Sequence, residues 1–158
     1  MKFWHYTTYP AFLNILEERK IRTTWATASI GLLEGPRLVW FSTNDLWEQS
    51  VRKAIKSEIY EEKIKPLSMD ELFRKGHYPV RLRTNERLSE LMSWGRAKKQ
   101  IGLTREHIKE IEGIAKAWDS NIAEWWVCLE PVTMPQILLP VEMWNGRAWG
   151  DIEKFEFT

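Results

Sequence analysis

The stretch FWHYTTYPAFLNILE, residues 3–17, decides how the chain begins to fold. Its first part is aromatic and rich in residues that favour strands, so we expect a strand over 2–7. Thr8 can cap a helix, Pro10 suits a first helical turn, and the apolar spacing that follows predicts a helix over about 10–20. The chain is therefore expected to open with a strand that leads directly into a helix.

The predicted strand places the ionisable side chain of His5 on a defined face. Because successive side chains of a strand point to opposite sides, Phe3, His5 and Thr7 share one face, and Trp4 and Tyr6 share the other. A histidine on a half-buried strand is more often a structural hydrogen-bonding group than a catalytic one. The residues next to His5 in the sequence make a functional role for this histidine as well supported as a structural one.

The rest of the chain also carries both strand and helix patterns. Further strands are expected at 37–43, 78–84, 124–130, 137–144 and 151–158, and further helices at 45–60, 68–73 and 104–118. The last three strands follow one another with little helix between them, which does not suit a regular array of strand–helix–strand units. We therefore predict one α+β domain over 1–158, with a mixed or split β-sheet core flanked by helices.

Composition excludes several classes of protein and of site. The chain has 158 residues, with 23 Lys and Arg against 22 Asp and Glu, so no strong overall field draws it onto nucleic acid or an anionic membrane. The single cysteine, Cys128, rules out an intrachain disulfide, and the three histidines lack metal-ligand spacing. No signal-peptide pattern or membrane-spanning run is present, so a soluble cytoplasmic protein is expected.

Ten tryptophans are the unusual feature of the composition. They are Trp4, Trp25, Trp40, Trp47, Trp94, Trp118, Trp125, Trp126, Trp144 and Trp149. Most of these side chains must be buried, because each carries a large apolar area. Some of them could line a cleft for a planar ligand.

Three motifs in this order resemble the ADP-ribosyltransferase fold, in particular the DNA-targeting ADP-ribosyltransferase toxins and related small proteins that begin with a "YHYT" strand. The first motif is WHYT at 4–7 with the helix FLNILEERKI at 12–21. The second is the strand VWFST at 39–43, and the third is AEWWVCLEPVTMPQIL at 123–138, where Glu124 opens a strand. The resemblance covers the first 45 residues and about the last 35, and leaves the middle of the chain unmatched.

The resemblance implies that NAD is the substrate and that no metal takes part. It assigns the catalytic role to Glu124, whose carboxylate would stabilise the oxocarbenium-like ribose that forms as nicotinamide leaves. The residues that it implies for binding NAD are His5, Tyr6, Thr7, Phe41 and Ser42. Arg81 lies in the unmatched middle of the chain, and we add it to the predicted NAD site because of its charge. Arg81 shares a strand face with Arg83. One of these arginines would meet the phosphates of NAD or of a nucleic acid, and the other would protect a sheet edge.

The sequence leaves three interpretations open. The first is ADP-ribosyl transfer or NAD hydrolysis; Ile122 stands where several toxin groups have Gln or Glu, so nucleic acid, a small molecule or water is favoured over protein arginine as acceptor. The second is a non-catalytic module that binds a nucleotide or a partner on the same fold, in a toxin–antitoxin or defence system. The third is a toxin-like or antitoxin-like protein whose tryptophan-rich surface forms an oligomer interface.

Overall fold

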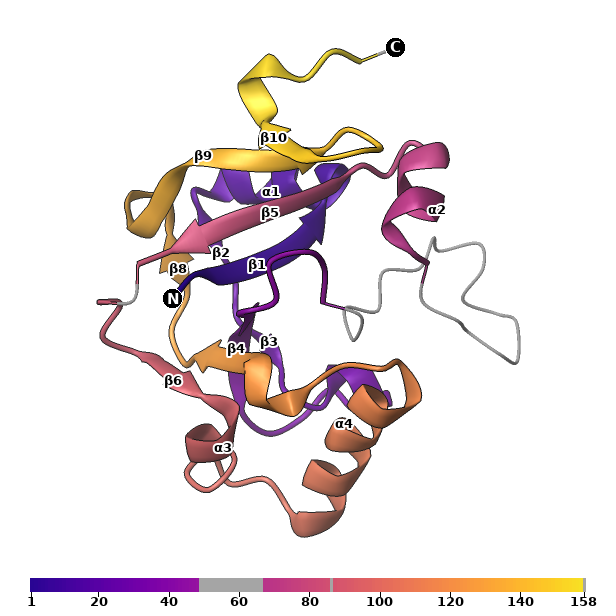
Figure 1. Ribbon diagram of the computed structural model, residues 1–158. Helices are drawn as coiled ribbons and strands as arrows, with labels where there is room; N and C mark the ends of the chain where they lie inside the picture. Colours follow the sequence, from indigo (N-terminus) through magenta and orange to yellow (C-terminus); the bar gives the residue numbers. More distant parts are fainter. Residues whose placement is uncertain (49–66, 86, 158) are drawn as a thin grey trace.

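A strand that leads directly into a helix opens the chain, as predicted from 3–17. The computed structural model describes residues 1–48, 67–85 and 87–157 (Figure 1). The strands are β1 (Phe3–Thr8), β2 (Lys20–Ile21), β3 (Thr24–Trp25), β4 (Arg37–Ser42), β5 (Pro79–Thr84), β6 (Leu91–Ser93), β7 (Trp125–Cys128), β8 (Val132–Thr133), β9 (Ile137–Trp144) and β10 (Trp149–Asp151). The α-helices are α1 (Tyr9–Glu18), α2 (Met69–Arg74), α3 (Trp94–Ala97) and α4 (Arg105–Ala117).

Most strands belong to one sheet in the order β10-β9-β5-β1-β4-β7-β6, with β3 paired to β4, while β2 and β8 form a separate pair. Every pairing between described strands is antiparallel. The predicted α+β class is confirmed, with a mostly antiparallel sheet and few helices. The prediction left a mixed or a split sheet open, and the mixed form is not found among the described strands, because all of their pairings are antiparallel.

The sheet is weakest where β1 meets β4. These strands share one residue pair, Trp4 with Ser42, whereas β1 and β5 share six pairs and β4 and β7 share four. Figure 1 shows β9, β5 and β1 together with α1 in one half of the molecule, and β4, β6, α3 and α4 in the other. The sheet therefore consists of two half-sheets that meet at one point, and β1 and β4 separate beyond it.

The two faces of β1 bury different side chains, as its alternation predicts. Phe3 belongs to a core cluster with Phe12 and Ile15 of α1. Trp4 and Tyr6 belong to a separate cluster that also contains Trp47, Leu67 and Leu72. The predicted alternation is confirmed, and it determines on which side of the sheet each β1 side chain lies.

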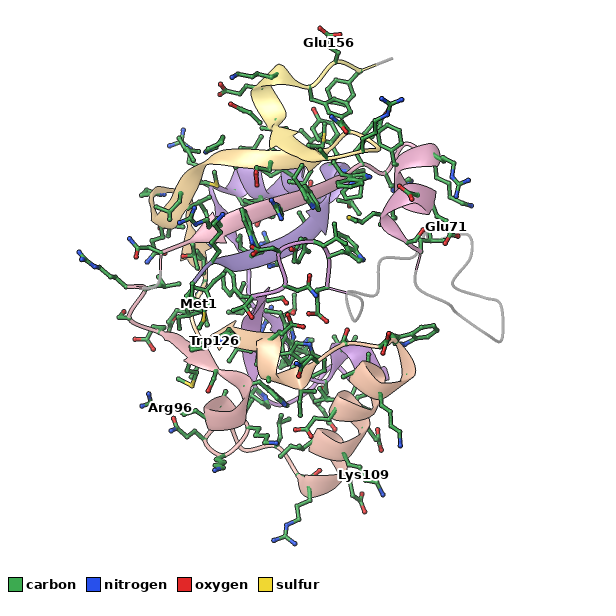
Figure 2. All side chains as sticks on the ribbon, viewed as in Figure 1. Met1, Glu71, Arg96, Lys109, Trp126 and Glu156 are labelled. Atoms are coloured by element: carbon green, nitrogen blue, oxygen red, sulfur yellow. The ribbon has the colours of Figure 1, made fainter. Side chains whose placement is uncertain are left out.

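Helix α4 supports the second half-sheet. Thr104 caps it by accepting a hydrogen bond from the His107 backbone N–H at 3.0 Å. Ile111 and Ala115 are buried in a cluster with Trp94 and Trp125, while Figure 2 shows Lys109 on the outer side of the helix. The predicted amphipathic helix at 104–118 is confirmed.

Two expectations about secondary structure need correction. The predicted strand at 151–158 stops at Asp151, because the Asp151 carboxylate accepts from the Glu153 backbone N–H at 2.9 Å and caps a short 3₁₀ turn. The first residues of the predicted helix at 45–60, 45–48, form a loop, and the rest of that prediction lies outside the described residues. No helix in the described part of the chain is long and apolar enough to cross a membrane.

Candidate functional site

A cavity of about 950 Å³ opens where β1 and β4 separate. Its wall comes from β1, α1, β2, β3, β4, α4 and β7, so both half-sheets and both longer helices contribute to it. The residues that line it include the aromatic residues Trp4, Tyr6, Trp25, Trp40, Phe41 and Trp125. Its volume lies at the upper end of the range of small-molecule sites, about 300–1,000 Å³, which is large enough for a dinucleotide.

His5 bridges the opening between the two half-sheets and lines the cavity. Its Nδ1 lies 2.9 Å from the carbonyl oxygen of Trp40. A carbonyl oxygen can only accept, so Nδ1 carries a proton and donates it to this hydrogen bond. The ring also packs edge-on against Phe41 at 5.9 Å between centroids. These two contacts therefore hold the imidazole in one orientation.

Five of the seven predicted site residues meet at this cavity: His5, Tyr6, Thr7, Phe41 and Ser42. Thr7 and Ser42 are buried, and Ser42 stands at the junction because it faces both Trp4 of β1 and Trp125 of β7. The Tyr6 side chain makes contacts within the protein: its ring contacts Trp47 and Trp149, and its hydroxyl donates to the Asn44 carbonyl.

Arg81 is not among the residues that line the cavity. Its guanidinium binds Glu142 Oε1 through Nε at 2.9 Å and Nη2 at 2.7 Å, and its Nη1 donates to the Asp45 carbonyl. The guanidinium carbon lies over the rings of Trp4 and Trp149, 3.8 and 4.6 Å from their centroids. The structure therefore does not bring Arg81 to the other predicted site residues. The positive charge of Arg81 is paired with Glu142.

Glu124 also lies outside the cavity lining. It ends a 3₁₀ turn, Ile122–Glu124, immediately before β7, and its side chain is partly exposed. Its carbonyl oxygen accepts from the Thr43 N–H at 3.0 Å, so its backbone is close to the end of β4. The predicted position at the opening of a strand is correct, but the cavity wall does not include the residue.

Among the described residues, the carboxylates that line the cavity are Glu18 and Glu48. Glu18 is partly exposed and pairs with Arg22, whereas Glu48 is only 5% exposed. Donors to it include Ser42 Oγ, 2.7 Å from Oε2, and Ser120 Oγ and Trp125 Nε1, 2.6 and 3.1 Å from Oε1. These bonds join β4, the chain before the 3₁₀ turn, and β7. They hold both carboxylate oxygens in a fixed position within a largely apolar wall.

Sequence reasoning missed Glu48 because it treated 45–60 as one helix and proposed no site residue in it. The signal that could have found it was its closeness in sequence to the VWFST motif at 39–43. Glu48 lies five residues after the end of this motif and directly follows Trp47. Within the described residues no group of three His, Cys, Asp or Glu side chains could hold a metal ion.

Comparison of the chain with known proteins finds no family model, no curated protein and no solved structure that matches it.

Proposed function

We propose that the cavity between β1 and β4 binds NAD and cleaves its nicotinamide–ribose bond, and that ADP-ribose then passes to an acceptor or to water. The observation that carries this proposal is the joint presence of His5 and a buried carboxylate, Glu48, in one aromatic-lined cavity of about 950 Å³. The proposal includes an ADP-ribosyltransferase-like fold, which the opening strand and helix and the separated half-sheets support.

The reaction needs no redox step. The bond between ribose C1′ and the nicotinamide nitrogen breaks, and its electron pair neutralises the pyridinium ring, which leaves as nicotinamide. The ribose becomes oxocarbenium-like until an acceptor oxygen or nitrogen attacks C1′ and releases a proton. A fixed negative charge in a water-poor cavity lowers the barrier to this step electrostatically.

We assign the carboxylate role to Glu48, because it is the buried glutamate of the cavity wall and lies beside Ser42 and Trp125. The other lining glutamate, Glu18, is partly exposed and paired with Arg22. His5 lines the cavity with its Nδ1 bound to the Trp40 carbonyl, and we assign to it the contact with a ribose hydroxyl. Phe41 and the neighbouring tryptophans offer apolar faces for the nicotinamide ring. Glu124, which the resemblance favours, is the alternative carboxylate. The acceptor we favour is nucleic acid, a small molecule or water.

A second candidate function is nucleotide binding without catalysis. It is favoured by the hydrogen bonds from Ser42, Ser120 and Trp125, which suit a carboxylate that ties three segments together. A carboxylate with this structural role would line the cavity without acting on the ligand.

Product analysis separates the two candidates. The protein is incubated with NAD, alone and with single-stranded DNA or RNA, and mass spectrometry follows nicotinamide, free ADP-ribose and ADP-ribosylated nucleic acid. Calorimetry measures NAD binding in parallel. Transfer or hydrolysis predicts nicotinamide together with an equal amount of ADP-ribose, free or attached. Binding without nicotinamide would favour the non-catalytic module, and neither binding nor product would exclude both.

A further inference from the structure

Side chains from three strands bind three consecutive carbonyl groups of the loop 43–48. The Tyr6 hydroxyl of β1 donates to the Asn44 carbonyl, and Arg81 Nη1 of β5 donates to the Asp45 carbonyl. Trp149 Nε1 of β10 donates to the Leu46 carbonyl at 2.9 Å. The loop is therefore fixed to the first half-sheet through its backbone, although its chain continues from β4 of the second.

Local hydrogen bonds tighten the same loop. Asn44 Oδ1 accepts from the backbone N–H groups of Leu46 and Trp47 at 3.0 and 3.3 Å, and the Asn44 N–H donates to Ser42 Oγ at 3.1 Å. Trp4 Nε1 donates to Asp45 Oδ1 at 2.9 Å. Two residues after the last bound carbonyl, the chain reaches Glu48, so the path of the loop fixes where this residue can lie.

Arg81 is itself held rigidly, which suits a residue that positions something else. It is 8% exposed, its guanidinium lies against the rings of Trp4 and Trp149, and Glu142 binds it through two nitrogen atoms. A planar guanidinium that is held by a carboxylate and lies over two aromatic rings presents its remaining N–H groups in set directions. These contacts also leave it poorly placed to bind the phosphates of a ligand in the cavity.

We propose that Tyr6 and Arg81 are positioning residues, which act through the loop 43–48 to hold the Glu48 carboxylate in the cavity wall. The inference rests on the proposed function for its catalytic consequence, because a carboxylate displaced by about 1 Å can lose on the order of a hundredfold in rate. The position of Glu48 can be measured without any activity. Failure of this inference is therefore distinguishable from failure of the proposed function.

The indole N–H of Trp125 reports the position of the carboxylate, because it donates to Glu48 Oε1 at 3.1 Å. Its proton NMR resonance is assigned by its loss in Trp125→Phe. The matched control is the indole of Trp94, which donates to Glu112 Oε1, also at 3.1 Å. Arg81→Lys keeps the charge but cannot hold Glu142 and the Asp45 carbonyl with the same geometry. We expect the Trp125 resonance to move and the Trp94 resonance to stay.

Tyr6→Phe is the milder second variant, because it removes only the hydroxyl that donates to the Asn44 carbonyl. It keeps the inference testable if Arg81→Lys does not fold. We expect the same movement of the Trp125 resonance, together with a kcat for nicotinamide release reduced about tenfold and a Kd for NAD changed less than about twofold.

Three outcomes would overturn the inference. The first is a Trp125 resonance unchanged in a folded variant, since Glu48 would then keep its place without these contacts. The second is movement of the Trp94 resonance by as much as that of Trp125, which would indicate a general loosening of the fold. The third is a Kd for NAD that rises as much as kcat falls, which would make these residues part of the binding surface.

Discussion

The loop 43–48 and the turn Ile122–Glu124 lie side by side, and each carries one glutamate. The N–H of Thr43 donates to the Glu124 carbonyl at 3.0 Å, so the two segments are in direct contact. Glu48 is buried and lines the cavity, whereas Glu124 is partly exposed and does not. Both glutamates belong to segments near the end of β4, but only Glu48 lines the cavity, so closeness to a strand end does not determine which carboxylate reaches it.

The contacts that shape each segment explain the difference. The turn is a local structure, in which Asn121 Oδ1 accepts from the Ala123 N–H at 3.0 Å and the Asn121 carbonyl accepts from the Glu124 N–H at 2.9 Å. The loop is held by side chains that are distant in sequence, on β1, β5 and β10. Long-range anchoring directs Glu48 inward, and local capping leaves Glu124 at the surface.

The largest effect expected from this comparison is on stability. Glu48→Ala leaves buried donors such as Trp125 Nε1 and the Ser42 hydroxyl without their acceptor, which should lower the free energy of unfolding by about 3 kcal/mol or more. Glu124→Ala, at a partly exposed site, should cost about 0.5 kcal/mol or less. Urea unfolding of the two variants measures both values. Equal losses would remove the distinction between the two segments.

Alkaline pH should weaken the anchoring of the loop. Burial raises the pKa of the Tyr6 phenol above its ordinary value of 10.0. Below pH 10 both folded and unfolded Tyr6 are protonated, and the full stabilisation is present. Above pH 10 the unfolded phenol ionises first, so the free energy of unfolding should fall by up to about 1.4 kcal/mol per pH unit until the raised pKa is passed.

Tyr6→Phe is the control for the alkaline measurement, because Phe has no proton to lose. Its free energy of unfolding should be lower than that of the wild type at neutral pH but should fall less steeply between pH 10 and 12. Urea unfolding in this range compares the two slopes. Identical slopes would show that another group causes the alkaline loss.

The strand-to-helix opening, α4 and most strands could be predicted, because strand alternation, Pro10 in the first turn of α1 and the Thr104 cap of α4 are local signals. The predicted cap at Thr8 is wrong, since its side chain makes no cap hydrogen bond. The single residue pair between β1 and β4 could not, since nothing local marks where two paired strands separate. The resemblance selected five residues that meet at the cavity. It could not reveal that Arg81 is paired with Glu142, because that pair joins β5 to β9, 61 residues apart.

The smallest expected effect is on the affinity for NAD. His5→Ala should weaken NAD binding about fivefold, the loss of one hydrogen bond of about 1 kcal/mol, because the imidazole is held at the mouth of the separated strands. His107→Ala, on α4, is the control and should leave the Kd unchanged. Calorimetric titration measures both. An unchanged Kd in the His5 variant with lower thermal stability would make His5 structural.

The most direct test of the central claim compares nicotinamide release by Glu48→Gln and Glu124→Gln, since each change removes the charge and keeps the shape. The rate is measured with saturating NAD, and the exposed Glu130→Gln is a third variant. We predict a loss of roughly a hundredfold or more for Glu48→Gln with NAD affinity little changed, and rates within about threefold of wild type for the other two. A hundredfold loss for Glu124→Gln with Glu48→Gln near wild type would contradict the account.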